Sequence, residues 1–135
     1  MARHTGHCHC GTLRVEFETS KPLAPRECQC SFCRKHHARS VSDPDGSAVL
    51  TLSSDTLRYQ FGTGSGEFVI CGECGVYVGA VQAIDGQLYA VLNLTAFDDP
   101  HDGLAGEAMS YDGESGVDRA ARRRARWTPA RIVEN

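Results

Sequence analysis

Hydrophobic and polar residues alternate along much of this chain. In residues 12–19, Leu13, Val15 and Phe17 fall on one face, and charged side chains occupy the other. A period of two residues is typical of a strand with one buried face. Similar apolar or β-branched runs predict further strands at residues 48–52, 57–61, 67–70, 76–83 and 87–93. The pattern therefore predicts a protein built mainly from short antiparallel strands.

A helix is expected only near the C-terminus. Ser115 is a suitable N-cap, Asp118 would lie near the positive end of the helix dipole, and Pro129 limits the helix length. Between two predicted strands, the pair Asp85-Gly86 favours a two-residue hairpin. We predict a single domain over residues 1–135, with a helical extension at about residues 115–128.

Composition excludes several classes of protein. The chain of 135 residues is long enough for a real hydrophobic core, and its net charge of −3 gives it no general affinity for polyanions. No apolar stretch approaches the ~20 residues that a membrane span needs, and the polar N-terminus does not resemble a signal peptide. We expect a cytoplasmic protein that binds neither membranes nor nucleic acid.

Charge is distributed unevenly near the C-terminus. Seven acidic residues and no Lys or Arg occur from Asp98 to Asp118, whereas five arginines and no acid occur from Arg119 to Arg126. The simplest interpretation is two solvated surfaces. A dimer contact, a nucleic-acid patch and a cradle for an anionic ligand stay open as alternatives. The lack of aromatic residues among the arginines before Trp127 weighs against nucleic acid.

The chemistry of the chain is concentrated in its seven cysteines, which form three tight groups. Metal binding explains them better than disulfides do, because seven is odd and the closely spaced pairs would close strained rings. Seven sulfurs make one complete tetrahedral zinc site and leave three ligands for a site with an open position. The groups are Cys8 and Cys10; Cys28, Cys30 and Cys33; and Cys71 and Cys74.

Spacing alone does not decide which cysteines share a metal. Cys71 and Cys74, followed by Gly75, have the form of a zinc knuckle that needs two more ligands. These ligands could come from Cys8 and Cys10 or from two cysteines of the middle group. Using the first pair leaves no spare sulfur, and this favours it.

Polar residues follow the middle cysteines directly. His36 and His37 are alternatives for a fourth metal ligand or for contact with a substrate. Arg34 and Lys35 would lower the pKa of the nearby thiols and attract an anionic substrate, and Arg39 could bind a carboxylate. Each of these residues could also be an ordinary surface residue.

Three cysteine motifs and one later stretch together resemble a known family. Gly6-His7-Cys8-His9-Cys10-Gly11, the segment Cys28–Lys35, and Cys71-Gly72-Glu73-Cys74-Gly75 are similar to motifs of the glutathione-dependent formaldehyde-activating enzyme (GFA) family. The residues Val91–Leu94, followed by Asp98-Asp99-Pro100, also resemble a recurrent stretch of that family. The likeness covers a core of about residues 6–100.

The resemblance implies a Mss4-like fold, made of small antiparallel sheets built around zinc, with the C-terminal helix added. It implies two zinc ions per chain, of which the second can be partly occupied. A structural zinc would be held by Cys8, Cys10, Cys71 and Cys74. The second zinc would be held by Cys28, Cys30 and Cys33, where the sulfur of glutathione could approach.

The function implied is a zinc-dependent carbon–sulfur lyase of the S-(hydroxymethyl)glutathione synthase type. It would act on a small thiol and an aldehyde, with Cys28, Cys30 and Cys33 as the catalytic residues. The substrate contacts would come from Arg34, Lys35, His36 and His37. The alternative on the same fold is a non-catalytic zinc module that binds a protein or a thiol ligand, is chaperone-like or senses redox state. A homodimer stays open under either reading.

Overall fold

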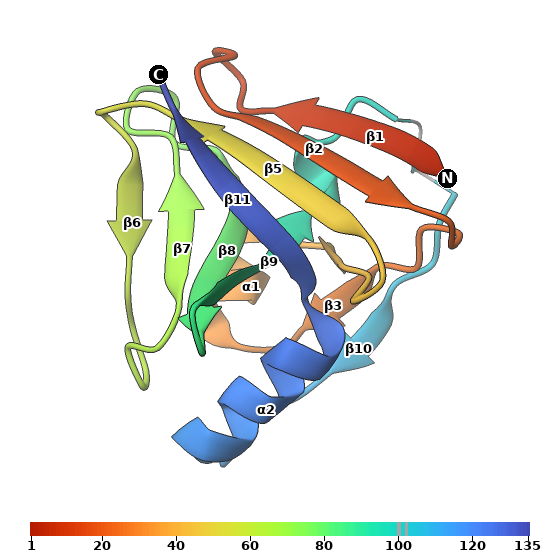
Figure 1. Cartoon of the computed structure of the whole chain (residues 1–135), viewed down its shortest axis with the longest axis vertical. Coiled ribbons are helices and arrows are strands. Elements are labelled where there is room, and N and C mark those ends of the chain that lie inside the picture. The colour runs from red at the N-terminus through yellow and green to blue at the C-terminus, as the bar shows by residue number, and fades with distance from the viewer. Residues whose placement is uncertain (100, 102) are drawn as a thin grey trace.

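The computed structural model describes residues 1–99, 101 and 103–135. Pro100, which ends the last stretch similar to the GFA family, and Asp102, in the acidic run, lie outside the described residues. Within the described part the chain forms eleven strands, two α-helices and one 3-10 helix (Figure 1). The mainly β architecture with a C-terminal helix is confirmed. The strands are β1 (Ala2–His7), β2 (Arg14–Thr19), β3 (Arg26–Cys28), β4 (Ser40–Val41), β5 (Ser47–Leu52), β6 (Leu57–Tyr59), β7 (Glu67–Ile70), β8 (Tyr77–Ile84), β9 (Gln87–Asn93), β10 (Glu107–Met109) and β11 (Thr128–Glu134), and the helices are α1 (Ser31–His36), η1 (Leu94–Ala96) and α2 (Gly116–Arg126).

The strands hydrogen-bond into one continuous sheet instead of separate small sheets. Its main path runs β1-β2-β5-β11-β9-β4-β3-β10, and β8, β7 and β6 extend from β9 as a second branch. Most neighbours are antiparallel, but β11 pairs with β5, and β10 with β3, in parallel. Strand β11 joins the two halves, because residues 130–134 pair with β5 whereas Thr128 and Pro129 pair with β9 (Figure 1).

The alternating pattern of the second strand produces the expected burial. The exposed fractions of Leu13, Val15 and Phe17 are 0%, 1% and 2%. Their side chains pack into the main core with apolar residues of β5, β8 and β9. Because burying a large aliphatic or aromatic side chain contributes roughly 1.5–3 kcal/mol, this face holds β2 on the core.

Local turn and cap signals are also confirmed. Asp85 and Gly86 both have positive φ angles, 51° and 82°, as a two-residue hairpin with the right twist requires. The Ser115 side chain accepts a hydrogen bond from the backbone N–H of Asp118 at the start of α2. Both features depend on residues close together in the chain.

Seven elements were not expected from the sequence, namely β1, β3, β4, β10, β11, α1 and η1. Strand β1 is polar and mostly exposed, and it forms as an edge strand because all six of its residues pair with β2. Helix α2 ends before Pro129, as expected, and Pro129 is the second residue of the unexpected strand β11. The short helix α1 begins inside the middle cysteine group, with Cys30 as its N-cap.

Helix α2 packs through an arginine and not through its alanines. Arg123 is the buried residue of this helix, with an exposed fraction of 7%. The residue after the helix, Trp127, is buried against Ala80 and Val91. None of the helices in the described part of the chain is long and apolar enough to cross a membrane.

Candidate functional site

Four cysteines from opposite ends of the first hundred residues meet in one cluster, which we call the four-cysteine cluster: Cys8, Cys10, Cys71 and Cys74. Their sulfur atoms all lie within 4.8 Å of one another. The Cys10 Sγ atom is 3.6 Å from the Cys8 Sγ and 3.6 Å from the Cys71 Sγ. Four sulfurs around a tetrahedral zinc with bonds of ~2.3 Å would be about 3.8 Å apart. The donor set therefore fits zinc.

Two tight turns present these sulfurs. Gly11 and Gly75 follow the two pairs with φ angles of 83° and 81°, which a residue with a side chain rarely adopts. The backbone N–H of Leu13 donates to the Cys8 Sγ at 3.2 Å, and the N–H of Cys74 donates to the Cys71 Sγ at 3.4 Å. Such donors stabilise thiolates, the form that binds metal.

The remaining cysteines, Cys28, Cys30 and Cys33, form the three-cysteine cluster, whose sulfurs also lie within 4.8 Å of one another. Cys28 ends β3, Cys30 caps α1, and Cys33 lies in the first turn of α1. This grouping answers the question that spacing left open, because Cys71 and Cys74 are joined by the first pair and not by the middle cysteines. None of the seven cysteines, all of them described, forms a disulfide.

Hydrogen bonds within the three-cysteine cluster favour the thiolate form of one cysteine, Cys30. Hydrogen bonds from Cys28 and Cys33, together with the backbone N–H of Cys33 at 3.4 Å, lower the pKa of Cys30 to about 2. The pKa values of Cys28 and Cys33 are raised, chiefly because each shares a proton with a neighbouring sulfur. The cluster therefore favours a thiolate on Cys30, the form that binds a thiophilic metal.

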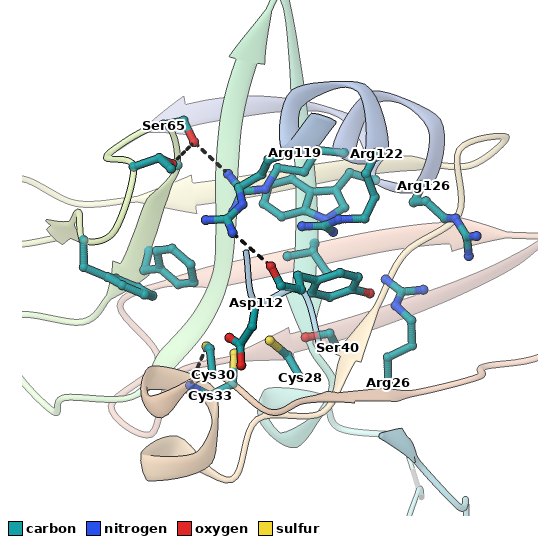
Figure 2. Close-up of a pocket in the computed structure, with 18 of the residues that line it drawn as sticks. Arg26, Cys28, Cys30, Cys33, Ser40, Ser65, Asp112, Arg119, Arg122 and Arg126 are labelled. Atoms are coloured by element: carbon teal, nitrogen blue, oxygen red, sulfur yellow. Dashed lines mark hydrogen bonds between the residues drawn. The ribbon is translucent and has the colours of Figure 1, made fainter. Parts of the chain in front are cut away.

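A pocket of about 120 Å³, which we call the arginine pocket, opens beside the three-cysteine cluster. Figure 2 shows arginines of α2 across the pocket from the cysteines, with the Asp112 carboxylate between them. Aromatic side chains form much of the remaining wall. The arginines are Arg26, Arg119, Arg122, Arg123 and Arg126, and the aromatic residues are Phe61, Phe68, Tyr77, Tyr111 and Trp127.

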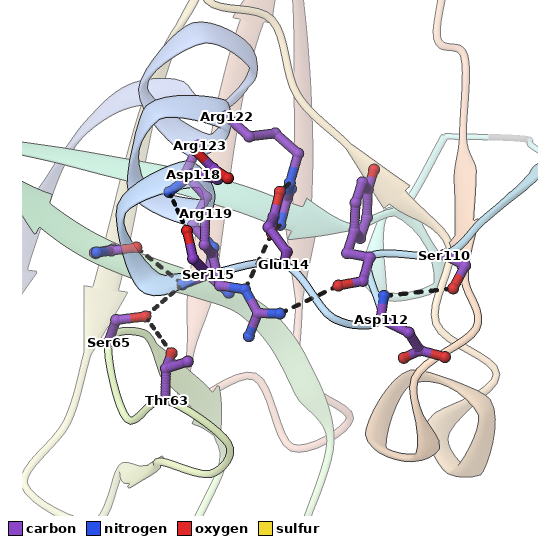
Figure 3. A network of polar contacts seen from close by, with 12 residues as sticks. Thr63, Ser65, Ser110, Asp112, Glu114, Ser115, Asp118, Arg119, Arg122 and Arg123 are labelled. Carbon is purple, nitrogen blue, oxygen red and sulfur yellow. Dashed lines mark hydrogen bonds and ion pairs between the residues drawn. The ribbon is translucent and has the colours of Figure 1, made fainter.

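Glu114 orders two of the arginines from the side (Figure 3). It accepts hydrogen bonds from the Arg119 Nε at 3.1 Å and from the Arg122 Nε at 2.9 Å. The guanidinium of Arg122 also lies over the Tyr111 ring, 3.6 Å from its centroid. The hydrogen bonds from Arg122 and then Arg119 hold the pKa of Glu114 below its usual value, although burial opposes them.

Arg123 is buried and Arg26 is half-buried, and both have neutral partners. Arg123 Nη1 donates to the Gln82 Oε1 at 2.8 Å and to the Ser65 Oγ at 3.4 Å, and its Nε is buried without a hydrogen-bond partner. Arg26 donates to the Ser42 hydroxyl at 2.6 Å. Burial lowers the pKa of Arg123 to about 10 and also lowers the pKa of Arg26.

The residues expected to contact a substrate lie elsewhere. Arg34, Lys35 and His37 are exposed on and after α1, and the His36 ring packs against the Phe32 ring in a tilted arrangement, with a centroid distance of 4.4 Å. None of these four lines the arginine pocket. Their contact with a substrate stays a prediction, as does the role of the cysteines as metal ligands.

Arg39 also points away from the pocket, because its guanidinium donates to the backbone carbonyls of His101 and Leu104. Sequence reasoning missed Arg26, Tyr77, Asp112 and the α2 arginines as pocket residues. The uninterrupted arginine run was the available signal, and a cradle for an anion was among its interpretations.

Fold and site together define a small, mainly β domain with two cysteine clusters suited to metal. The family model for glutathione-dependent formaldehyde-activating enzyme matches residues 3–112, so the chain belongs to this family. A crystal structure of a Rhodobacter sphaeroides protein is similar, with 25% sequence identity and a TM-score of 0.59 over 78% of this chain and 99% of that chain. Helix α2, with its arginines, follows the matched residues.

Proposed function

We propose that this protein catalyses the reversible joining of a small thiol to an aldehyde, as in the formation of S-(hydroxymethyl)glutathione from glutathione and formaldehyde. Membership of the GFA family supports this class of reaction. The observation that carries the proposal is the three-cysteine cluster at a pocket wall, where a small ligand can reach it.

Two zinc sites fit the cysteines. Cys28, Cys30 and Cys33 would hold one ion and leave a coordination position for a ligand from outside, whereas the four-cysteine cluster would be closed. When bound at the open site, zinc lowers the pKa of a coordinating thiol and polarises a carbonyl oxygen.

The chain itself supplies proton transfer and orientation. In the forward direction the thiol loses its proton, its sulfur forms a bond to the aldehyde carbon, and the carbonyl oxygen takes up a proton. Asp112 lies at the cysteine end of the pocket and is placed to accept the first proton and return one to the oxygen (Figure 2). The hydroxyl of Tyr77, another lining residue, can donate a hydrogen bond to the developing oxyanion.

The aromatic wall has a separate role. Phe61, Phe68 and Trp127 limit the access of water to the reacting groups. Hydrogen bonds and charges act more strongly in such an environment than in bulk water. The pocket thus combines a cysteine cluster suited to a metal, a carboxylate that can transfer protons, and an apolar wall that limits the access of water.

The test is the rate of hemithioacetal formation with zinc-loaded protein, followed for several small aldehydes with glutathione. We expect acceleration over buffer, a loss of about 10²-fold in Asp112→Asn from removal of the proton carrier, and a near-complete loss in Cys30→Ser. If no aldehyde reacts faster than in buffer, the proposal is wrong. Ligand binding without acceleration would favour the non-catalytic zinc module.

A further inference from the structure

The arginine pocket contains more positive charge than its neighbours balance. Five guanidinium groups line it, but among the described residues Asp112 is the only carboxylate that lines it. Glu114 forms ion pairs with Arg119 and Arg122 from outside the lining. In the part of the chain that the structure describes, neither Arg26 nor Arg123 forms an ion pair. Even a zinc ion held by three thiolates, with its single net negative charge, leaves a positive surplus.

Such a surplus is costly in a partly buried place. Burying a guanidinium without a counter-charge usually costs several kcal/mol, so proteins generally pair a buried arginine with a carboxylate or another anion. Arg26 and Arg126 lie on the same side of the pocket (Figure 2). Burial is the main cause that lowers the pKa of Arg26, and the nearby charges of Arg126 and Arg122 lower it further. An anion between these groups would offset the repulsion and compensate for part of the desolvation cost.

We propose that Arg26 and the α2 residues Arg123 and Arg126 form a carboxylate-binding site beside the three-cysteine cluster, so that the substrate carries one or two carboxylates. The proposal rests on the thiol–aldehyde function and names its substrate class. It assigns recognition of the anionic group to the C-terminal helix, which follows the residues matched by the family model. Guanidinium forks bind carboxylates through paired hydrogen bonds and therefore orient them.

Two reactants could bring the carboxylate. A thiol such as glutathione carries two of them, and an aldehyde of the 2-oxo acid type, such as glyoxylate, carries one. In either case the arginines would fix the charged end of the molecule, and its reacting sulfur or carbonyl would point toward Cys28, Cys30 and Cys33 (Figure 2).

Succinate is a suitable probe because it is a dicarboxylate with no thiol or aldehyde. Its binding to zinc-loaded protein can be measured by titration calorimetry, with neutral succinamide as the ligand control. We expect about tenfold weaker binding in Arg126→Gln and in Arg123→Gln, since each loses a charge-assisted contact. Arg126 has an exposed side chain, so its replacement should leave the fold intact even if Arg123→Gln unfolds.

Arg124→Gln is the matched control. Arg124 lies on the same helix and carries the same charge, but it pairs with Asp85 and does not line the pocket. Its replacement should leave succinate binding unchanged. If wild-type protein binds no succinate, or if Arg124→Gln weakens binding as much as Arg126→Gln does, the carboxylate site is wrong.

Kinetics separates the two sources and the two proposals. Formaldehyde with glutathione, glyoxylate with 2-mercaptoethanol, and formaldehyde with 2-mercaptoethanol place the carboxylate on the thiol, on the aldehyde or on neither. We expect the anionic pair that reacts faster to be slowed in Arg126→Gln. Equal rates for all three pairs, unchanged in that variant, would overturn the carboxylate site but leave thiol–aldehyde catalysis standing. If succinate binds with the expected pattern but no pair is turned over, the carboxylate site would stand and thiol–aldehyde catalysis would be wrong.

Discussion

The sulfur atoms of Cys10 and Cys71 lie 3.6 Å apart although 61 residues separate them in the chain. The turn before β2 and the turn after β7 are therefore brought together, and with them the two branches of the sheet. A metal held across this contact would close a long loop of the unfolded chain, which is where such a link restricts the denatured state most. The three-cysteine cluster, in contrast, is local to β3 and α1.

Metal analysis should distinguish the two clusters. We expect wild-type protein to contain two zinc ions, and Cys30→Ser to lose one of them and remain folded. Cys71→Ser should lose the other and unfold at much lower temperature, because a structural zinc contributes on the order of 10 kcal/mol to the folded state. The checks are metal content after mild chelation and circular dichroism on heating. Global unfolding of Cys30→Ser would contradict the assignment.

Gly72, between Cys71 and Cys74, has no room for a side chain. A Cβ atom there would lie 1.9 Å from the backbone oxygen of Asp55. Gly72→Ala should therefore destabilise the protein by about 2 kcal/mol and weaken metal retention, since overpacking typically costs 1–3 kcal/mol. Gly116→Ala is the control, because nothing lies within 4 Å of a Cβ at that position. Equal chemical denaturation curves for the two variants would contradict this prediction.

Asp43 should make stability depend on acid pH. Burial alone would raise the pKa of this carboxyl, but hydrogen bonds from Lys21 at 2.7 Å and Thr19 at 2.6 Å hold the pKa below its usual value. A depressed pKa means that the stabilisation is present above the pKa of the unfolded state, about 3.9, and is lost as pH falls through the lower folded-state value. Denaturant melts from pH 7 down to pH 2 should show this loss.

Replacement of the same carboxyl provides the comparison. Asp43→Asn should lower the free energy of unfolding at pH 7 by about 2 kcal/mol, because charge-assisted hydrogen bonds are lost. The difference from wild type should shrink as pH falls below about 4. Asp45→Asn, which affects an exposed partner of Lys21, should cost much less. A difference that is the same at pH 2 and pH 7 would rule out titration of Asp43.

Glu114 should be worth more than an ordinary surface ion pair. Its side chain is 16% exposed and accepts from Arg119 and Arg122, whereas the pair Arg124–Asp85 has side chains that are 51% and 76% exposed. We expect Glu114→Gln to lower stability by about 1–2 kcal/mol and Asp85→Asn by less than about 0.5 kcal/mol. Thermal melts of the two variants measure the difference. High salt should reduce the second effect more than the first.

Patterns that act over a few residues could be predicted from the sequence. The alternation around Val15, the hairpin at Asp85-Gly86 and the Ser115 cap depend on side-chain period, backbone sterics and a nearby hydrogen bond. Strand β1 could not be predicted in the same way, because its residues are polar and it exists only by pairing with β2. The pairing energy depends on a neighbouring strand that cannot be identified from the residue pattern of β1 itself.

The candidate site divides along the same line. The motifs indicated a metal-binding, thiol-handling protein of the GFA family, because thiolate chemistry and spacing are properties of the chain itself. The sequence placed substrate contacts on Arg34 and Lys35, next to the cysteines in the chain. The structure leaves these two outside the pocket and brings in Arg123 and Arg126, about ninety residues away, over the three-cysteine cluster.

The sequence by itself thus determined the mainly β class, the family and the three cysteine groups that we propose carry the chemistry. The tertiary structure agrees with the expected division of the cysteines into four and three, and only the tertiary structure decided that α2 covers the second group with positive charge. The physical reason is that short-range preferences are encoded in neighbouring residues. Contacts between segments that are distant in the sequence depend on which strands pair and which faces are buried. Both are determined by the packing of the whole chain.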